Sequence, residues 1–149
     1  MKFLLDTNII LVYLKDKSTR DRIDNLYDPL GPNNIPILSI VSLGELESIM
    51  LRNNWGKRKV QKLEELLNGF LIADINFKDV IKKYAEIDAF SQGKLKDNPL
   101  NLSARNMGKN DLWIAATAAV TDSKLLTTDK DFDHLNGKYL DLVQIQLIK

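Results

Sequence analysis

Four acidic residues of this 149-residue chain stand where short apolar runs give way to segments of helical spacing. Asp6 follows the run KFLL, Glu45 comes shortly after IPILSI, Asp111 opens the segment DLWIAATAAV, and Asp129 follows KLLTT. The carboxyl ends of parallel strands lie at one edge of an open sheet, where ligands bind. We therefore expect the four carboxylates to converge on one patch.

Each acid taken alone has a simpler interpretation as part of a helix cap. The segment SLGE, from Ser42 to Glu45, matches a capping box, and Asp6, Asp111 and Asp129 suit N-caps or first turns. Ser, Thr and Asn cap a helix as well as Asp does, and such residues stand beside these acids. Capping therefore does not explain why an ionisable residue recurs at every junction.

Grouped carboxylates favour a bound cation. Two of them about 5 Å apart repel by roughly 3 kcal/mol at an effective dielectric constant near 20. Such a group takes up protons or binds a positive ion. Because no Cys or His stands near these acids, the oxygen ligands favour Mg²⁺ or Mn²⁺ over zinc.

The chain lacks the residues that other hydrolytic mechanisms need. It has no cysteine and one histidine, so a thiolate nucleophile and a two-histidine acid–base ribonuclease are excluded. His134 lies in the polar stretch DKDFDHLNG, and we expect it at the surface. Phosphate-binding and dinucleotide-binding glycine motifs are also absent. What remains is metal-assisted hydrolysis, in which an ion lowers the pKa of a bound water and stabilises the leaving oxygen.

The order of elements predicts a single α/β domain spanning residues 1–149. Short strand-like runs alternate with helical segments, which indicates a parallel sheet covered on both faces. The expected strands are residues 2–5, 35–40, 70–74, 124–129 and 141–148. The segment SQGKLKDNPLNLSARNMGK, residues 91–109, is expected as a long loop that forms a lip over a site.

The net charge is +1, but basic residues gather in two stretches. They form either a solvated face or phosphate contacts beside the acids. The candidate RNA-binding residues are Arg52, Lys57, Arg58, Lys94, Lys96, Arg105 and Lys109. No stretch approaches the roughly 18 apolar residues of a membrane span. Together with the lack of cysteine, this predicts a cytoplasmic protein without a membrane partner.

Four blocks of the sequence resemble the PIN-domain nucleases, especially the VapC-type toxins. The blocks are LLDTNII, SLGELE, NDLWIAATA and LLTTDKDF, which come in the family's order between Leu4 and Phe132. The resemblance implies a central parallel sheet of order 3-2-1-4-5 and Mg²⁺- or Mn²⁺-dependent endoribonuclease activity on RNA. It also implies a homodimer and a cognate antitoxin that fills the site.

The resemblance also assigns roles to residues by position. It implies that Asp6 and Asp111 are the most direct metal ligands, while Glu45 and Asp129 position a second ion or the attacking water. All four count as catalytic, and Asp131 is a nearby substitute for Asp129. Expected supporting residues are Thr7, Asn8 and Thr128. Trp55 and Tyr84 could stack a base, although they and Trp113 are more simply explained as packing residues.

Three alternatives to a toxin remain open at this stage. One is a housekeeping PIN-type nuclease of RNA maturation without an antitoxin, and another is a PIN-like module that binds RNA or protein without cutting. The filled acidic positions argue against the second. A phosphotransfer domain of haloacid-dehalogenase type needs a second Asp two residues after the first, where this chain has Asn8.

Overall fold

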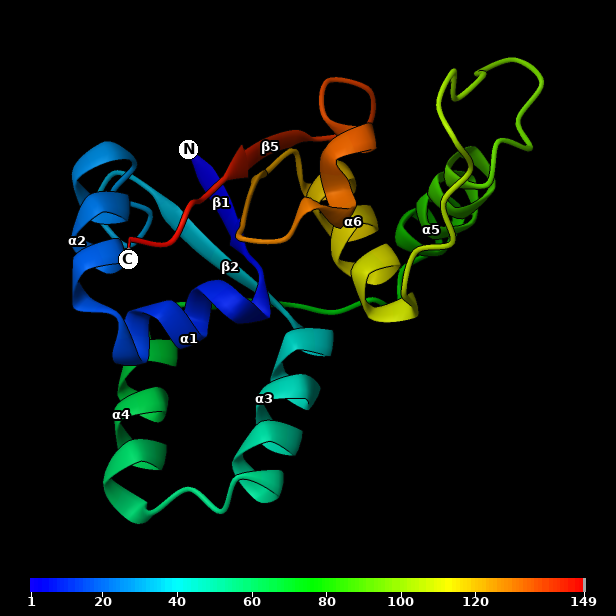
Figure 1. The fold of residues 1–149 in the computed structure, drawn as a ribbon. Coiled ribbons are helices and arrows are strands. Elements are labelled where there is room, and N and C mark those ends of the chain that lie inside the picture. The colour runs from blue at the N-terminus through cyan, green and yellow to red at the C-terminus, as the bar shows by residue number, and fades with distance from the viewer. Residues whose placement is uncertain (149) are drawn as a thin grey trace.

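A five-stranded parallel sheet forms the centre of the protein, whose computed structural model describes residues 1–148 (Figure 1). The strands lie in the order β3-β2-β1-β4-β5, which confirms the predicted topology. Their bounds are β1 Lys2–Leu5, β2 Ile35–Ser39, β3 Leu71–Ala73, β4 Lys124–Thr127 and β5 Asp141–Gln144. Leu4 pairs with Ile37 on one side and Leu125 on the other, so the carboxyl ends of the three central strands share one edge.

Six α-helices and one 3-10 helix connect and cover the strands. Their bounds are α1 Thr7–Lys15, α2 Lys17–Leu26, α3 Ile40–Arg52, α4 Lys57–Leu67, α5 Lys78–Ser91, α6 Lys109–Thr121 and η1 Lys130–Leu135. Strands β2 to β5 are shorter than expected, because they end at Ser39, Ala73, Thr127 and Gln144. Only β1 has the bounds that the sequence predicted. In the described residues, no helix is both long and apolar enough to cross a membrane.

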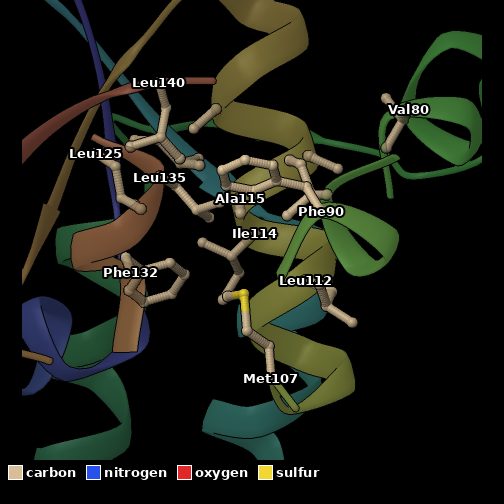
Figure 2. Packing of buried hydrophobic residues seen from close by; sticks show 14 of the residues in the cluster. Val80, Phe90, Met107, Leu112, Ile114, Ala115, Leu125, Phe132, Leu135 and Leu140 are labelled. Atoms are coloured by element: carbon tan, nitrogen blue, oxygen red, sulfur yellow. The ribbon is translucent and has the colours of Figure 1, made fainter. Parts of the chain in front are cut away.

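Alternate residues of the strands build two separate cores, one on each face of the sheet. Leu4 and Leu125 face α5, α6 and η1, and Figure 2 shows the side chains of this core turned toward one another. Leu5 and Leu126, the next residues along, face α1, α2 and α4. All four are fully buried. The sheet is therefore covered on both faces, as strands apolar on both sides require.

The prediction that His134 lies at the surface is wrong. Its side chain is only 6% exposed, and it stacks parallel to the ring of Phe90. The polar character of its stretch misled the prediction, because η1 turns Asp131 and Asp133 outward and His134 inward. A buried imidazole needs hydrogen-bond partners, and the Oγ atom of Ser91 lies 2.7 Å from Nε2.

Residues 92–108 contain no helix or strand, as predicted, but they are fastened to the body at several points. The backbone N–H of Arg105 donates to the carbonyl of Ser91 over 2.6 Å, and Arg105 Nη1 lies 3.3 Å from Nδ1 of His134. Leu100 and Met107 are buried in the core beside α5 and α6. The end of the segment is thus held next to the start of α6, where Asp111 lies.

Candidate active site

Asp6 stands at the end of β1 and is 5% exposed. As the N-cap of α1, it accepts a hydrogen bond from the backbone N–H of Thr7 at Oδ1 (2.8 Å), while the hydroxyl of Thr127 donates to Oδ2 (2.7 Å). Burial raises the pKa of this carboxyl, the two hydrogen bonds oppose that rise, and the charges of Glu45 and Asp129 add to it. Because a carboxylate has about four acceptor positions, capping leaves room for a ligand.

Glu45 reaches the same place from α3. This helix begins at Ile40 with Ser39 as its N-cap, so Glu45 lies in the second turn and the capping-box interpretation of SLGE is wrong. The hydroxyl of Thr7 donates to Oε1 of Glu45 over 2.9 Å and also lies 2.9 Å from Oγ of Ser42. Glu45 is therefore bound to the first residue of α1 rather than to the start of its own helix.

Asp111 is the third residue of α6 and is surrounded by other acids. Burial, followed by the charges of Asp6, Asp129, Asp131 and Glu45, raises the pKa of Asp111 to about 7. The N-cap of α6 is Gly108, and Asp111 lies in the first turn, one of the two places predicted, where the helix dipole favours an acid. Carboxylates from four separate parts of the chain thus act on one another at this edge of the sheet.

The most compact group of carboxylates contains Asp111, Asp129 and Asp131, whose nearest oxygens all lie within 4.8 Å of one another. Asp129 is the N-cap of η1, where its Oδ1 accepts from the N–H of Asp131 over 3.0 Å. The sequence predicted Asp131 only as a substitute and Asp6 as a direct ligand. In the described residues, Asp6 and Glu45 lie outside this compact trio and next to it.

Thr127 is a supporting residue that the sequence reasoning missed. Its hydroxyl donates to Asp6 and accepts from the N–H of Asp129 (3.0 Å), so it joins two of the acids. Thr128, the residue expected in this role, contributes its backbone N–H to Oδ1 of Asn8 (3.3 Å). Strand pairing explains the position of Thr127. Leu5 of β1 pairs with Leu126 of β4, so Asp6 and Thr127, the residues that follow them, lie side by side.

The sequence model of the PIN domain matches residues 3–138, which include all of these acids. The chain belongs to the PIN-domain family. The toxins of this family are nucleases.

Solved structures agree with this PIN fold over almost the whole chain. VapBC2 from Rickettsia felis bound to a promoter DNA fragment is similar at 23% identity and a TM-score of 0.74, covering 98% of this chain and 100% of that one. VapBC-1 from nontypeable Haemophilus influenzae is 24% identical with a TM-score of 0.67, covering 97% and 98%. VapBC-5 from Mycobacterium tuberculosis, a member of the VapBC family of toxin–antitoxin systems, is 22% identical with a TM-score of 0.62, covering 97% and 98%. No curated protein sequence matches the chain.

The donor set of this PIN domain fits a hard divalent cation. All the side chains of the acidic group offer oxygen, the ligand atom that Mg²⁺ and Mn²⁺ prefer. The pKa of Asp111, raised by burial and then by the neighbouring acids, also fits, because a cation among these acids would offset their repulsion.

The seven basic candidates of the PIN domain lie at different places around the acids. Arg52 lines a hollow together with Glu45, and Arg105 lines a second hollow together with Asp131. Lys109 is exposed at the start of α6, two residues before Asp111. Exposed residues on α4 or in the loop, for which the structure gives no contact with the acids, are Lys57, Arg58, Lys94 and Lys96.

Proposed function

We propose that this PIN domain is a Mg²⁺- or Mn²⁺-dependent endoribonuclease that hydrolyses phosphodiester bonds of RNA. The main support is Asp111, a partly buried carboxyl whose pKa is raised to about 7 by burial and by four neighbouring acids. Five carboxylates at one edge repel one another unless they take up protons or bind a cation, and the proposal is that a cation binds them. Their presence also argues against a module that binds RNA without cutting it.

The acidic residues have different roles in the proposed reaction. Asp111, Asp129 and Asp131 would hold the cation, and Asp6, held by hydrogen bonds from Thr7 and Thr127, would complete the site. Glu45, oriented by Thr7, accepts a proton of the attacking water and aligns it with the phosphorus. The bound ion supplies positive charge at the phosphate and lowers the pKa of that water.

We further propose that the protein is the toxin of a type II toxin–antitoxin pair and acts in the cytoplasm as a homodimer. The similar solved structures support the toxin assignment, because they are VapBC proteins that match 97–98% of this chain. The homodimer and the cytoplasm are what the resemblance to VapC-type toxins implies. A cognate antitoxin would then silence the nuclease by filling the acidic site. A housekeeping nuclease remains the alternative, and a neighbouring small reading frame for a DNA-binding protein separates the two.

The test compares wild type with Asp6→Asn and Asp111→Asn on total RNA, in Mg²⁺ and in chelator. Only wild type with metal is expected to cut, and each variant should lose at least about 100-fold in rate, as when a group that stabilises the transition state is removed. Asp79→Asn is the matched control, because it removes an exposed carboxylate at the start of α5. Undiminished cutting by Asp111→Asn, or cutting in chelator, would exclude the proposed site.

A further inference from the structure

A hollow of about 570 Å³ lies between α3 and α6, directly beside the acids. Glu45 belongs both to the acidic group and to the wall of this hollow, and Asn110 on the opposite wall immediately precedes Asp111. The volume lies within the range of small-molecule pockets. A nucleotide adjoining a phosphate at the acids would therefore have space in this hollow.

The walls of the hollow offer an aromatic ring and an amide. Trp113 lies two residues after Asp111, and its ring packs on that of Tyr84 with centroids 4.2 Å apart, which fixes the orientation of the indole. Bases stack on such rings with about 1–3 kcal/mol each. The side chain of Asn110 is exposed, and an amide can donate to and accept from the edge of a base.

The side chain of Arg52 places a positive charge at the end of the hollow that is farther from the acids. Arg52 is seven residues after Glu45 on α3, which places it about 10 Å further along the helix axis, toward the α3–α4 turn (Figure 1). Its Nε donates to the hydroxyl of Ser48 over 3.2 Å, so the guanidinium is held while its terminal nitrogens remain available for a phosphate. The acid and the cation thus lie at two ends of the wall that α3 forms, while the amide and the ring come from α6.

We propose that this hollow binds the nucleobase next to the cut phosphate and so sets the sequence preference of cleavage. Trp113 stacks the base, Asn110 reads its edge and Arg52 holds the following phosphate. The inference rests on the proposed nuclease function for its meaning, but the binding that it describes can be measured separately. Nucleic acid is favoured over a peptide because the hollow begins at the acidic site and ends at a cation.

The first experiment measures binding without cleavage. Trp55→Phe leaves Trp113 as the only tryptophan, and Asp111→Asn in the same protein keeps the RNA intact. Six-nucleotide single-stranded RNAs, each of one base, are titrated in Mg²⁺ while tryptophan fluorescence is recorded. We expect saturable quenching with one base preferred over the others. Binding of these RNAs, seen by anisotropy, without any quenching would overturn the inference.

A substitution that fills the hollow gives a sharper test of the same binding. A Cβ atom at Gly44, a helical residue on the wall, would meet no atom within 4 Å, so Gly44→Leu adds bulk without a backbone clash and replaces a poor helix former. In the fluorescence experiment it should weaken binding at least about tenfold. Ala85→Leu adds a similar side chain at an exposed position of α5 outside the hollow and should leave binding unchanged. Equal affinity of the two variants would overturn the inference.

The second experiment maps cut sites in a random-sequence RNA pool. Wild type should show a base preference beside the cut, Asn110→Ala should flatten it, and Gly44→Leu should raise KM about tenfold with kcat nearly unchanged. Unaltered preference and KM in both variants would overturn the inference, as would a loss of antitoxin inhibition alone, which would assign the hollow to a peptide. If no protein cuts, the nuclease proposal fails, and the binding experiment still decides the inference.

Discussion

Two buried polar clusters of this PIN domain differ in how their charges are balanced. Asp6 and His134 are almost equally buried, at 5% and 6% exposure. Around Asp6 the nearest charged groups, Glu45 and Asp129, carry the same sign, and burial with these charges raises its pKa. Around His134 both ring nitrogens have polar partners, and burial followed by the charge of Arg105 lowers its pKa.

The polar contacts of His134 form a chain of hydrogen bonds from Arg105 to Met107. The guanidinium of Arg105 can only donate, so Nδ1 of His134 accepts and its Nε2–H donates to Oγ of Ser91. The hydroxyl of Ser91 in turn donates to Sδ of Met107, 3.4 Å away. Burial, together with the charge of Arg105, lowers the pKa of His134. Both ring nitrogens of His134 and the hydroxyl of Ser91 thus have partners, and these contacts fasten residues 92–108 to α5 and η1.

The comparison teaches where a ligand is needed. A buried group with a complete set of partners stabilises the fold and leaves no place for an ion. Buried groups of one sign, held near each other by neutral hydroxyls, leave a charge imbalance that only a proton or a cation removes. Among the described residues, this distinction separates the acidic edge from the histidine cluster, although both are polar and buried.

Removing the hydrogen bonds of His134 should lower the free energy of unfolding more than any other substitution proposed here. His134→Ala removes a buried ring together with its contacts to Oγ of Ser91 and Nη1 of Arg105, so the free energy of unfolding should fall by about 2–4 kcal/mol in urea denaturation. Asp133→Ala, at the exposed neighbouring position, should change it by no more than about 0.5 kcal/mol. A similar loss in both variants would mean that the hydrogen bonds of His134 make no specific contribution to stability.

Removing one hydroxyl from the acidic edge should have the next largest effect. Thr127→Val takes away the donor to Oδ2 of Asp6, so at pH 8 the free energy of unfolding should fall by about 2 kcal/mol. Nuclease activity should fall about 10-fold or more, because a residue that orients ligands is lost. Thr128→Val is the matched control and should stay near wild type in both assays. Equal effects at the two positions would show that the hydroxyl of Thr127 does not orient Asp6.

The two clusters should respond to pH in opposite directions in chelator. The folded pKa of Asp111 is raised to about 7, so its contribution to stability is present below the unfolded pKa and is lost as pH rises toward 7. The folded pKa of His134 is lowered, so its contribution is present above pH 6.5 and is lost as pH falls.

Melting temperatures between pH 4 and 9 test this expectation. Asp111→Asn should remove the loss on the alkaline side, a gain of about 1 kcal/mol at pH 8 once solvent screening is counted. His134→Gln should reduce the loss on the acid side only. If Asp111→Asn melts below wild type at pH 8 in chelator, the acids do not repel one another in the folded protein.

The smallest effect concerns the basic residues around the acidic edge. Each phosphate contact of a single strand adds about 0.7 to the slope of log K against log salt. Arg52→Gln should lower the slope for RNA binding by about that amount, since Arg52 lines the hollow beside Glu45. Lys57→Gln with Arg58→Gln tests the exposed start of α4 separately. An unchanged slope in Arg52→Gln would show that this side chain does not contact the backbone of the RNA.

The sequence was informative wherever a residue's role follows from its chain neighbours. The apolar run before Asp6 predicted β1, and Asp6 itself caps α1 as its position suggested. The four blocks gave the family and with it the strand order. Prediction failed at Ser42, taken for a possible cap, because α3 begins at Ile40, where Ser39 already provides the hydroxyl that caps it. It failed at His134 because the polarity of a stretch does not say which side of a turn faces the core.

The amino-acid sequence by itself determined that this chain alternates strands and helices and that an acid follows each of several strands, since periodicity and composition are local properties. The tertiary structure alone decided which acids meet. Strand register brought Thr127 beside Asp6, and the turn of η1 brought Asp131 to Asp111. The pKa of Asp111 was decided there too, because burial and the field of neighbouring charges exist only when distant segments pack together.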